Sequence, residues 1–148
     1  MMKNKKYSEK ERIDLKVIIT LSRCFQSVRR AEEVWIKEKG VTLAQFGVIE
    51  LLYHKGEMNV REIIKKTLST AGNMTVVIDN LEKEGYITRD KNKNDKREYI
   101  IRISEKGNSF IESFFPEHIK NISKLLSVLT EEEKNKLTEI LKKLGKSI

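Results

Sequence analysis

The sequence has little of the chemistry on which disulfides, metal sites and most enzymes depend. It contains one cysteine, Cys24, which excludes an internal disulfide, and two isolated histidines, His54 and His118, which lack the spacing of metal ligands. It has no Ser/His/Asp set, no Walker loop and no paired catalytic carboxylates. We therefore expect a protein that is not an enzyme and that holds no metal and no cofactor.

A long hydrophobic run is also missing. No stretch reaches the roughly 18 apolar residues of a transmembrane helix, and the lysine-rich start is not followed by the apolar segment of a signal peptide. We therefore expect a cytoplasmic protein. The 148 residues suffice for one domain with attached helices, but not for two large domains.

Positive charge, by contrast, is in excess. Lys and Arg number 30 against 22 Asp and Glu, which gives a formal net charge of +8. Such an excess favours a polyanionic partner or an anionic membrane surface, because Lys and Arg displace counterions from phosphate groups. Hydrophobic residues make up 39% and charged residues 35% of the chain. This is polar for a compact monomer, so we expect part of the apolar surface to be buried against a partner.

Capping boxes, in which a cap residue is followed three residues later by Glu or Gln, divide the chain into helices. They occur at Ser8–Glu11, Thr42–Gln45, Asn59–Glu62 and Thr130–Glu133. We expect the first helix to end at Gly40, the second at Gly56, and a further helix over residues 69–84 to end at Gly85. Three short helices in succession within residues 42–85 are typical of a helix-turn-helix unit.

A β-hairpin is expected over residues 86–103, where the runs "YITR" and "EYIIRI" are separated by the polar loop "DKNKND". Helical spacing of apolar residues returns from Ser104 to about Leu129, and we expect Pro116 to kink or break this helix. The predicted fold is therefore mainly α-helical with one small β-hairpin.

The helix over residues 69–84 begins with residues that helices usually avoid. Those that we predict to contact DNA are Ser69, Thr70, Ala71, Gly72, Asn73, Thr75 and Val76. The apolar stripe that would face the core consists of Met74, Val77, Ile78 and Leu81. This arrangement would leave an amide, hydroxyls and valine methyls facing outward, where they can contact bases in the DNA major groove.

Two observations weaken this interpretation when the helix is taken alone. The same residues could be ordinary cap and turn residues of a small helical domain. The acidic Asp79, Glu82 and Glu84 would also oppose DNA phosphates, so we expect only the first two turns of the helix to enter the groove.

The hairpin that follows is basic. Between Arg89 and Arg102, six basic residues stand against three acidic ones. The residues that we predict to form a DNA-binding wing are Arg89, Lys93, Asp95, Lys96 and Arg97. Lysine-rich hairpin tips are also common as simple solvated turns, so the charge count alone does not decide between the two interpretations.

The order of these motifs, with "DKR" at residues 95–97 and "IRISEKG" at 101–107 after the helix ending "NLEKEGY", resembles the multiple-antibiotic-resistance regulator (MarR) family of winged-helix transcription factors. The resemblance implies a winged helix-turn-helix DNA-binding domain at residues 42–107. It also implies an N-terminal arm and dimerisation helix at residues 1–41 and C-terminal dimerisation helices at residues 108–148. In this family the wing-tip arginine enters the minor groove, which corresponds to Arg97, and an aspartate two residues earlier, Asp95, orients its guanidinium.

The resemblance further implies that two chains form a homodimer, which recognises a pseudo-palindrome in double-stranded DNA with half-sites about 10 base pairs apart. It implies a small-molecule pocket between the dimerisation helices and the winged helix, whose lining residues the sequence does not identify. We predict a sequence-specific transcriptional regulator, a repressor released by a small aromatic or phenolic ligand or by thiol modification, with no membrane partner. The alternative is a sequence-tolerant architectural DNA-binding protein.

Two roles are open to Cys24. It could be a small buried residue on the apolar stripe of Val17, Leu21 and Val28 in the first helix. It could instead be a redox sensor, as in the branch of this family that senses peroxide with a cysteine near the start of the first helix. Because the position of Cys24 does not match that branch, we favour the buried structural role.

Overall fold

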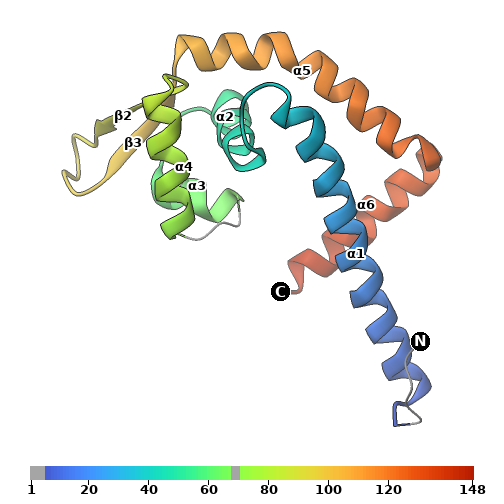
Figure 1. Ribbon diagram of the computed structural model, residues 1–148. Coiled ribbons are helices and arrows are strands. Elements are labelled where there is room, and N and C mark those ends of the chain that lie inside the picture. The colour runs from blue at the N-terminus through green and yellow to red at the C-terminus, as the bar shows by residue number, and fades with distance from the viewer. Residues whose placement is uncertain (1–5, 68–70) are drawn as a thin grey trace.

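The computed structural model describes residues 6–67 and 71–148, and the chain folds as predicted into a mainly helical protein with a small sheet (Figure 1). The helices are α1 (Glu9–Lys37), α2 (Leu43–Lys55), α3 (Val60–Thr67), α4 (Ala71–Lys83), α5 (Glu105–Leu125) and α6 (Glu131–Lys146), with a 3-10 turn at Leu126–Val128. The strands are β1 (Met58–Asn59), β2 (Ile87–Lys91) and β3 (Tyr99–Ile103).

Local capping explains where the helices begin. The boxes at Ser8, Thr42 and Thr130 are formed, each with the cap side chain accepting from the backbone three residues later and the Glu or Gln side chain accepting in return. Asn59 and Glu62 make the same reciprocal bonds at α3, at 2.8 and 2.9 Å. The turns after α1, α2 and α4 contain the glycines with positive φ, at 82° to 84°, a conformation that other residues rarely adopt.

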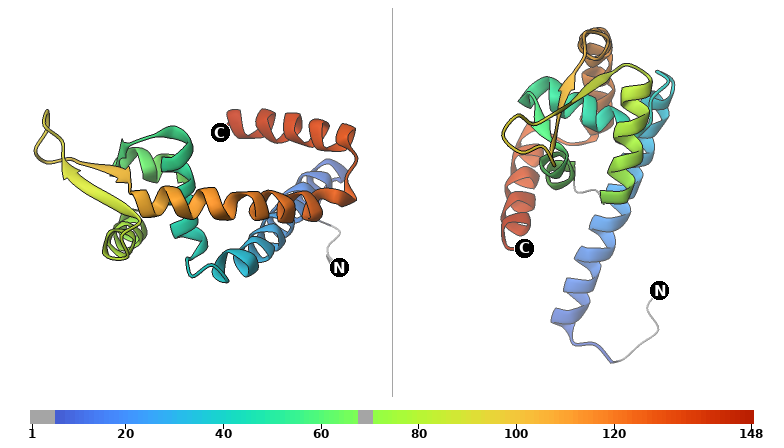
Figure 2. Two further views of the ribbon diagram at one scale, coloured as in Figure 1. Left: turned by 90° about the horizontal axis from the view of Figure 1, so that it is seen from above. Right: turned by 90° about the vertical axis from the view of Figure 1, so that its left-hand side faces the viewer.

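The sheet is antiparallel with the order β1-β3-β2, so the predicted hairpin gains a third strand. Met58 of β1 pairs with Ile101, and Ile87 of β2 pairs with Ile103. β1 was not predicted, because two residues between two helices carry no alternating pattern. The hairpin of β2 and β3 projects from one side of the molecule, opposite the corner between α5 and α6 (Figures 1 and 2).

The core lies where α2, α4 and the start of α5 meet the sheet. The stripe predicted for α4 is confirmed, since the buried residues of this helix are Met74, Val77, Ile78 and Leu81. Phe46 of α2 meets Phe114 of α5 edge to face, with ring centroids 5.5 Å apart. This packing fixes α4 by one face and leaves its other face exposed.

Of the two outcomes expected at Pro116, a kink or a break, the break is wrong. α5 continues through this residue to Leu125. Pro116 is exposed, so the carbonyl four residues earlier, which loses its intrahelical donor, lies on a side of the helix that water can reach.

The helices outside the winged helix keep uncovered apolar faces. In α1 the buried residue is Ile36, near the end of the helix. The large exposed apolar residues of α1 and α6 are Ile13, Val17, Ile18, Ile19, Phe25, Val34, Leu137, Ile140, Leu141 and Leu144. The expectation that Cys24 is buried is wrong for the single chain, where its side chain is exposed, because none of the elements in the described ranges covers this part of α1. Within residues 6–67 and 71–148, no helix is long and apolar enough to cross a membrane.

Candidate nucleic-acid interface

The exposed face of α4 carries the side chains predicted to meet DNA. Gly72, Asn73, Thr75 and Val76 are exposed, and Val76 keeps 58% of its surface accessible. Ser69 and Thr70 lie outside the described residues. An apolar side chain held outward on a helix whose opposite side is buried suits contact with a thymine methyl group, as the sequence analysis proposed.

Gly72 has open space around it. A Cβ atom built at this residue would have no neighbour within 4 Å, so the packing of the described chain gives no reason for glycine at this position. In the interior of a helix, glycine lowers the stability by about 1 kcal/mol relative to alanine. The absence of a side chain here is therefore consistent with close approach by something outside the chain.

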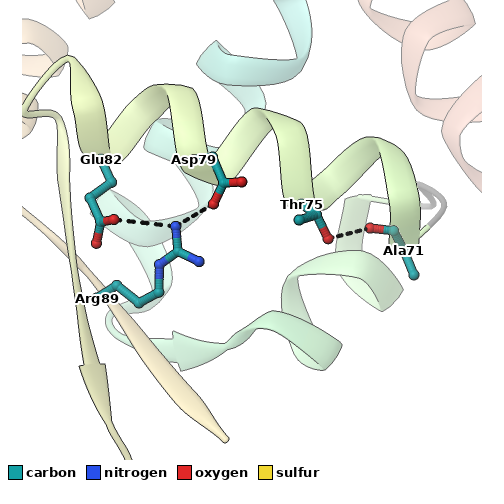
Figure 3. A network of polar contacts seen from close by, with 5 residues as sticks. All are labelled: Ala71, Thr75, Asp79, Glu82 and Arg89. Atoms are coloured by element: carbon teal, nitrogen blue, oxygen red, sulfur yellow. Dashed lines mark hydrogen bonds and ion pairs between the residues drawn. The ribbon is translucent and has the colours of Figure 1, made fainter.

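Thr75 and Asn73 also contact their own protein. The Thr75 hydroxyl donates to the carbonyl oxygen of Ala71 at 2.9 Å (Figure 3), so its oxygen remains as an acceptor. Asn73 borders a hollow of about 330 Å³ between α1, α2 and the start of α4, which Arg29 and Met74 also line. Asn73 therefore lies between the outer face of α4 and the interior of the molecule.

Arg89 of β2 reaches across to α4 rather than standing free on the wing. Its Nη2 donates to Oδ1 of Asp79 at 2.5 Å and to Oε1 of Glu82 at 3.3 Å (Figure 3). The hydrogen bond that Arg89 donates to Asp79 raises the pKa of Arg89 above its usual value. Two of the three carboxylates that were expected to oppose DNA phosphates, Asp79 and Glu82, are thus paired with a cation of the same chain.

The wing tip has the geometry that the resemblance implies. Oδ1 of Asp95 accepts from the backbone N–H of Arg97 at 3.0 Å and from its Nε at 3.4 Å. The Arg97 side chain is 93% exposed, and Lys93 and Lys96 are exposed beside it. The tip therefore presents an oriented guanidinium to solvent.

The base of the wing is fixed by a pair of contacts that the sequence analysis missed. Arg102 of β3 bonds to Glu57, before β1, and to Asp90 of β2, the latter at 2.9 Å. The contact with Glu57 raises the pKa of Arg102 above its usual value. Since 45 residues separate Arg102 from Glu57, only the pairing of β1 with β3 brings them together.

The "SEKG" motif at residues 104–107 has a structural role here. The Ser104 hydroxyl donates to the carbonyl of Gly85 at 2.5 Å and accepts from the N–H of Gly107 at 3.1 Å. Nζ of Lys106 donates to the carbonyl of Glu84 at 2.6 Å. A Cβ atom at Gly107 would lie 2.4 Å from the carbonyl oxygen of Tyr86. The motif therefore ties the end of α4 to the start of α5.

Two further hollows border these elements. One, of about 770 Å³, lies between α3 and the wing, where Arg61 faces it together with Arg97 and Tyr99. The other, of about 380 Å³, lies between α1, α2 and α3 and is lined by Arg29, Glu50, His54 and Lys66 among others. Burial raises the pKa of Glu50.

Among the described residues, no group of three His, Cys, Asp or Glu could hold a metal ion.

Comparison with known proteins agrees with this geometry. Residues 41–99 match the model of the MarR family. The chain is 37% identical to the HTH-type transcriptional regulator MhqR of Bacillus subtilis (strain 168), over 88% of this chain and 90% of that protein. A mutant of MarR from E. coli, solved in complex with operator DNA, is similar with a TM-score of 0.78 at 25% identity, over 90% of this chain and 95% of that one.

A third relative shares the fold. Bordetella bronchiseptica BpsR, whose structure concerns regulation of its DNA binding by 6-hydroxynicotinic acid, gives a TM-score of 0.81 at 20% identity, over 88% of this chain and 98% of that one. The fold of the described residues is thus found in regulators that bind DNA.

Proposed function

Because the chain belongs to the MarR family of transcriptional regulators, we propose that it acts as a homodimeric repressor that binds a pseudo-palindromic operator. The family consists of DNA-binding regulators and not enzymes. In the proposed complex, the exposed face of α4 enters the major groove and Arg97 enters the adjacent minor groove. The observation that carries the proposal is the outward display of Gly72 and Val76 on a helix whose other face is buried.

The electrostatics of the wing support the proposed minor-groove contact. A narrow minor groove concentrates negative potential and attracts arginine, and Asp95 holds the Arg97 guanidinium at the tip. Arg61, on α3, lines the hollow between α3 and the wing. We assign it a contact to a DNA phosphate, because among the described residues it has no ion-pair partner.

The uncovered apolar faces of α1 and α6 support the homodimer. An amphipathic helix gains stability when its apolar stripe is covered, and on α1 this stripe includes Val17 and Phe25, which are 52% and 62% exposed. A second copy of the chain would cover both helices and place two α4 helices on one duplex. We retain residues 1–41 and 108–148 as the proposed dimerisation segments, and residues 42–107 as the proposed DNA-binding domain.

The hollow between α1, α2 and α3 is the proposed effector site. Arg29 and Lys66 supply positive charge at its wall, which suits the carboxylate of a small aromatic acid. Arg29 also lines the neighbouring hollow beside Asn73. A ligand that binds Arg29 in the effector site would therefore change the surroundings of the start of α4. The alternative to release by a ligand is thiol modification at the exposed Cys24.

The effector site is tested by adding small aromatic acids to the protein and measuring its thermal unfolding and its DNA affinity. A bound acid should raise the unfolding temperature of the wild type and weaken its DNA binding. Arg29→Gln should abolish both effects. The matched control is Arg12→Gln, which removes the same charge from the same helix outside the hollow. Equal responses in both variants would exclude this site.

The repressor is distinguished from an architectural protein by its preference for one DNA sequence. We expect a selected pseudo-palindrome to bind at least about 10³-fold more tightly than random DNA of equal length at physiological salt. A protein that coats DNA would bind both duplexes alike across a salt series. Equal affinities at every salt concentration would favour the architectural alternative.

A further inference from the structure

Arg89 joins two elements that must meet the same DNA. It lies on β2, which leads into the wing tip, and its guanidinium bonds to Asp79 and Glu82 of α4 at 2.5 and 3.3 Å (Figure 3). Asp79 follows Thr75 by one helical turn on the same side of α4 (Figure 3). The contact therefore holds α4 immediately after the turns that carry the proposed base contacts.

The surroundings of Arg89 do not suit a direct contact with DNA. Its side chain is 22% exposed, whereas that of Arg97 is 93% exposed. The Nε atom is buried and has no hydrogen-bond partner among the described residues. The ring of Tyr99, on the neighbouring strand, lies 5.8 Å from the guanidinium carbon. The guanidinium is thus largely covered by α4, the sheet and an aromatic ring.

A rigid link between wing and helix has a direct consequence for DNA binding. The minor-groove and major-groove contacts can form together only if the wing and α4 have a fixed relative orientation. If that orientation were free, binding would have to select it and affinity would fall accordingly.

We propose that Arg89 is a positioning residue, which locks the wing to α4 through Asp79 and Glu82 and makes no contact with DNA of its own. This inference rests on the proposed function, since it assumes that both elements contact one duplex. It replaces the role in direct DNA binding that the sequence analysis assigned to Arg89. Asp79 and Glu82 become necessary for DNA binding although they are negatively charged.

The sign of the Asp79→Asn effect tests the proposal. Removing a negative charge from a DNA-binding helix should by simple electrostatics tighten binding. If Asp79 holds Arg89, the same change should weaken binding of the selected operator by about tenfold, or 1.4 kcal/mol. The matched control is Glu84→Gln, which removes an equal charge just after α4 from a side chain outside this cluster, and which should bind as tightly as the wild type or more tightly.

Arg89→Gln and the double variant complete a mutant cycle. We expect the single variant Arg89→Gln and the double variant Arg89→Gln/Asp79→Asn to bind the operator equally weakly. Each of them loses the same contact between Arg89 and Asp79. The slope of log K against log salt should remain that of the wild type, whereas loss of a phosphate contact would reduce it by about 0.9. Additive effects of the two changes, or a reduced slope for Arg89→Gln, would overturn the proposal.

Arg89→Lys keeps the test decisive if Asp79→Asn does not fold. Lysine retains the charge but lacks the planar fork that contacts two carboxylates, so we expect a partial loss of affinity. Wild-type affinity for this variant would indicate a direct phosphate contact instead. Failure of the wild type to prefer the operator over random DNA would refute the proposed function. Wild-type preference combined with tighter binding by Asp79→Asn would refute only the role of Arg89.

Discussion

The imidazole of His118 accepts a hydrogen bond from the indole N–H of Trp35, with Nδ1 and Nε1 3.0 Å apart. Trp35 lies on α1 and His118 on α5, and the His118 ring also lies 4.7 Å from the ring of Phe46 on α2. This contact therefore joins the proposed dimerisation helices to the winged helix. Because Nδ1 acts as the acceptor, the imidazole is neutral in this arrangement.

The Trp35–His118 contact predicts a loss of stability in mild acid. Burial lowers the pKa of His118 below its usual value, so below about pH 6.5 the unfolded chain binds a proton that the folded chain resists. The contribution of the neutral, buried His118 to the free energy of unfolding should be complete above that pH. It should fall as the pH decreases, by at most about 1.4 kcal/mol per pH unit. Denaturant unfolding between pH 7.5 and pH 5.5 measures this loss.

His118→Asn serves as the control for the pH dependence, because its carbonyl oxygen can accept from Trp35 without titrating in this range. We expect the variant to show a smaller decrease in the free energy of unfolding over the same pH interval. Identical decreases in both proteins would assign the pH dependence to other groups.

Gly107 and Gly72 should respond oppositely to alanine. At Gly107 the added methyl group would meet the Tyr86 carbonyl oxygen at 2.4 Å, and we expect Gly107→Ala to lower the free energy of unfolding by about 1 to 3 kcal/mol. At Gly72 the space is open, so alanine should stabilise the helix by up to about 1 kcal/mol. Gly72→Ala should nevertheless weaken DNA binding, because the methyl group occupies space that the duplex would approach.

Both measurements, unfolding and operator affinity, are needed for each glycine variant. Unchanged operator affinity in Gly72→Ala would remove this residue from the proposed interface. An unfolding free energy equal to that of the wild type in Gly107→Ala would contradict the close packing described for the "SEKG" motif.

Arg97→Ala should weaken operator binding by about tenfold or more and leave the unfolding temperature unchanged. The side chain is 93% exposed and does not belong to the core of the described residues. Lys120→Ala is the control, since it removes an exposed positive charge from α5. Equal operator affinities of Arg97→Ala and the wild type, measured by fluorescence anisotropy, would exclude the wing tip from the mechanism.

Cys24→Ser should bind the operator as tightly as the wild type, because Cys24 lies on α1 and not on the winged helix. We favour release by a ligand, so oxidant should leave the DNA affinity of the wild type unchanged. Loss of binding in the oxidised wild type but not in oxidised Cys24→Ser would instead establish the thiol route.

Features encoded by neighbouring residues could be predicted from the sequence. The capping boxes place the starts of α1, α2, α3 and α6, and the apolar spacing identifies the buried face of α4, because both depend on residues within a few positions of each other. The pairing of Asp95 with Arg97 was implied by the family resemblance. It too is local, because the two residues are two positions apart.

Features that depend on tertiary contacts could not be predicted. Arg89 was assigned to DNA because its partner, Asp79, lies on another element and the sequence does not show that the two meet. The bond between Arg102 and Glu57 and the exposure of Cys24 likewise depend on which elements pack together.

The most direct test of the account is selection of binding sites from a pool of random duplexes by the wild-type protein. We predict enrichment of an inverted repeat whose half-sites are centred about 10 base pairs apart, matching two α4 helices on successive major grooves. Failure to enrich any sequence, or enrichment of a single site without two-fold symmetry, would contradict the proposed homodimeric repressor.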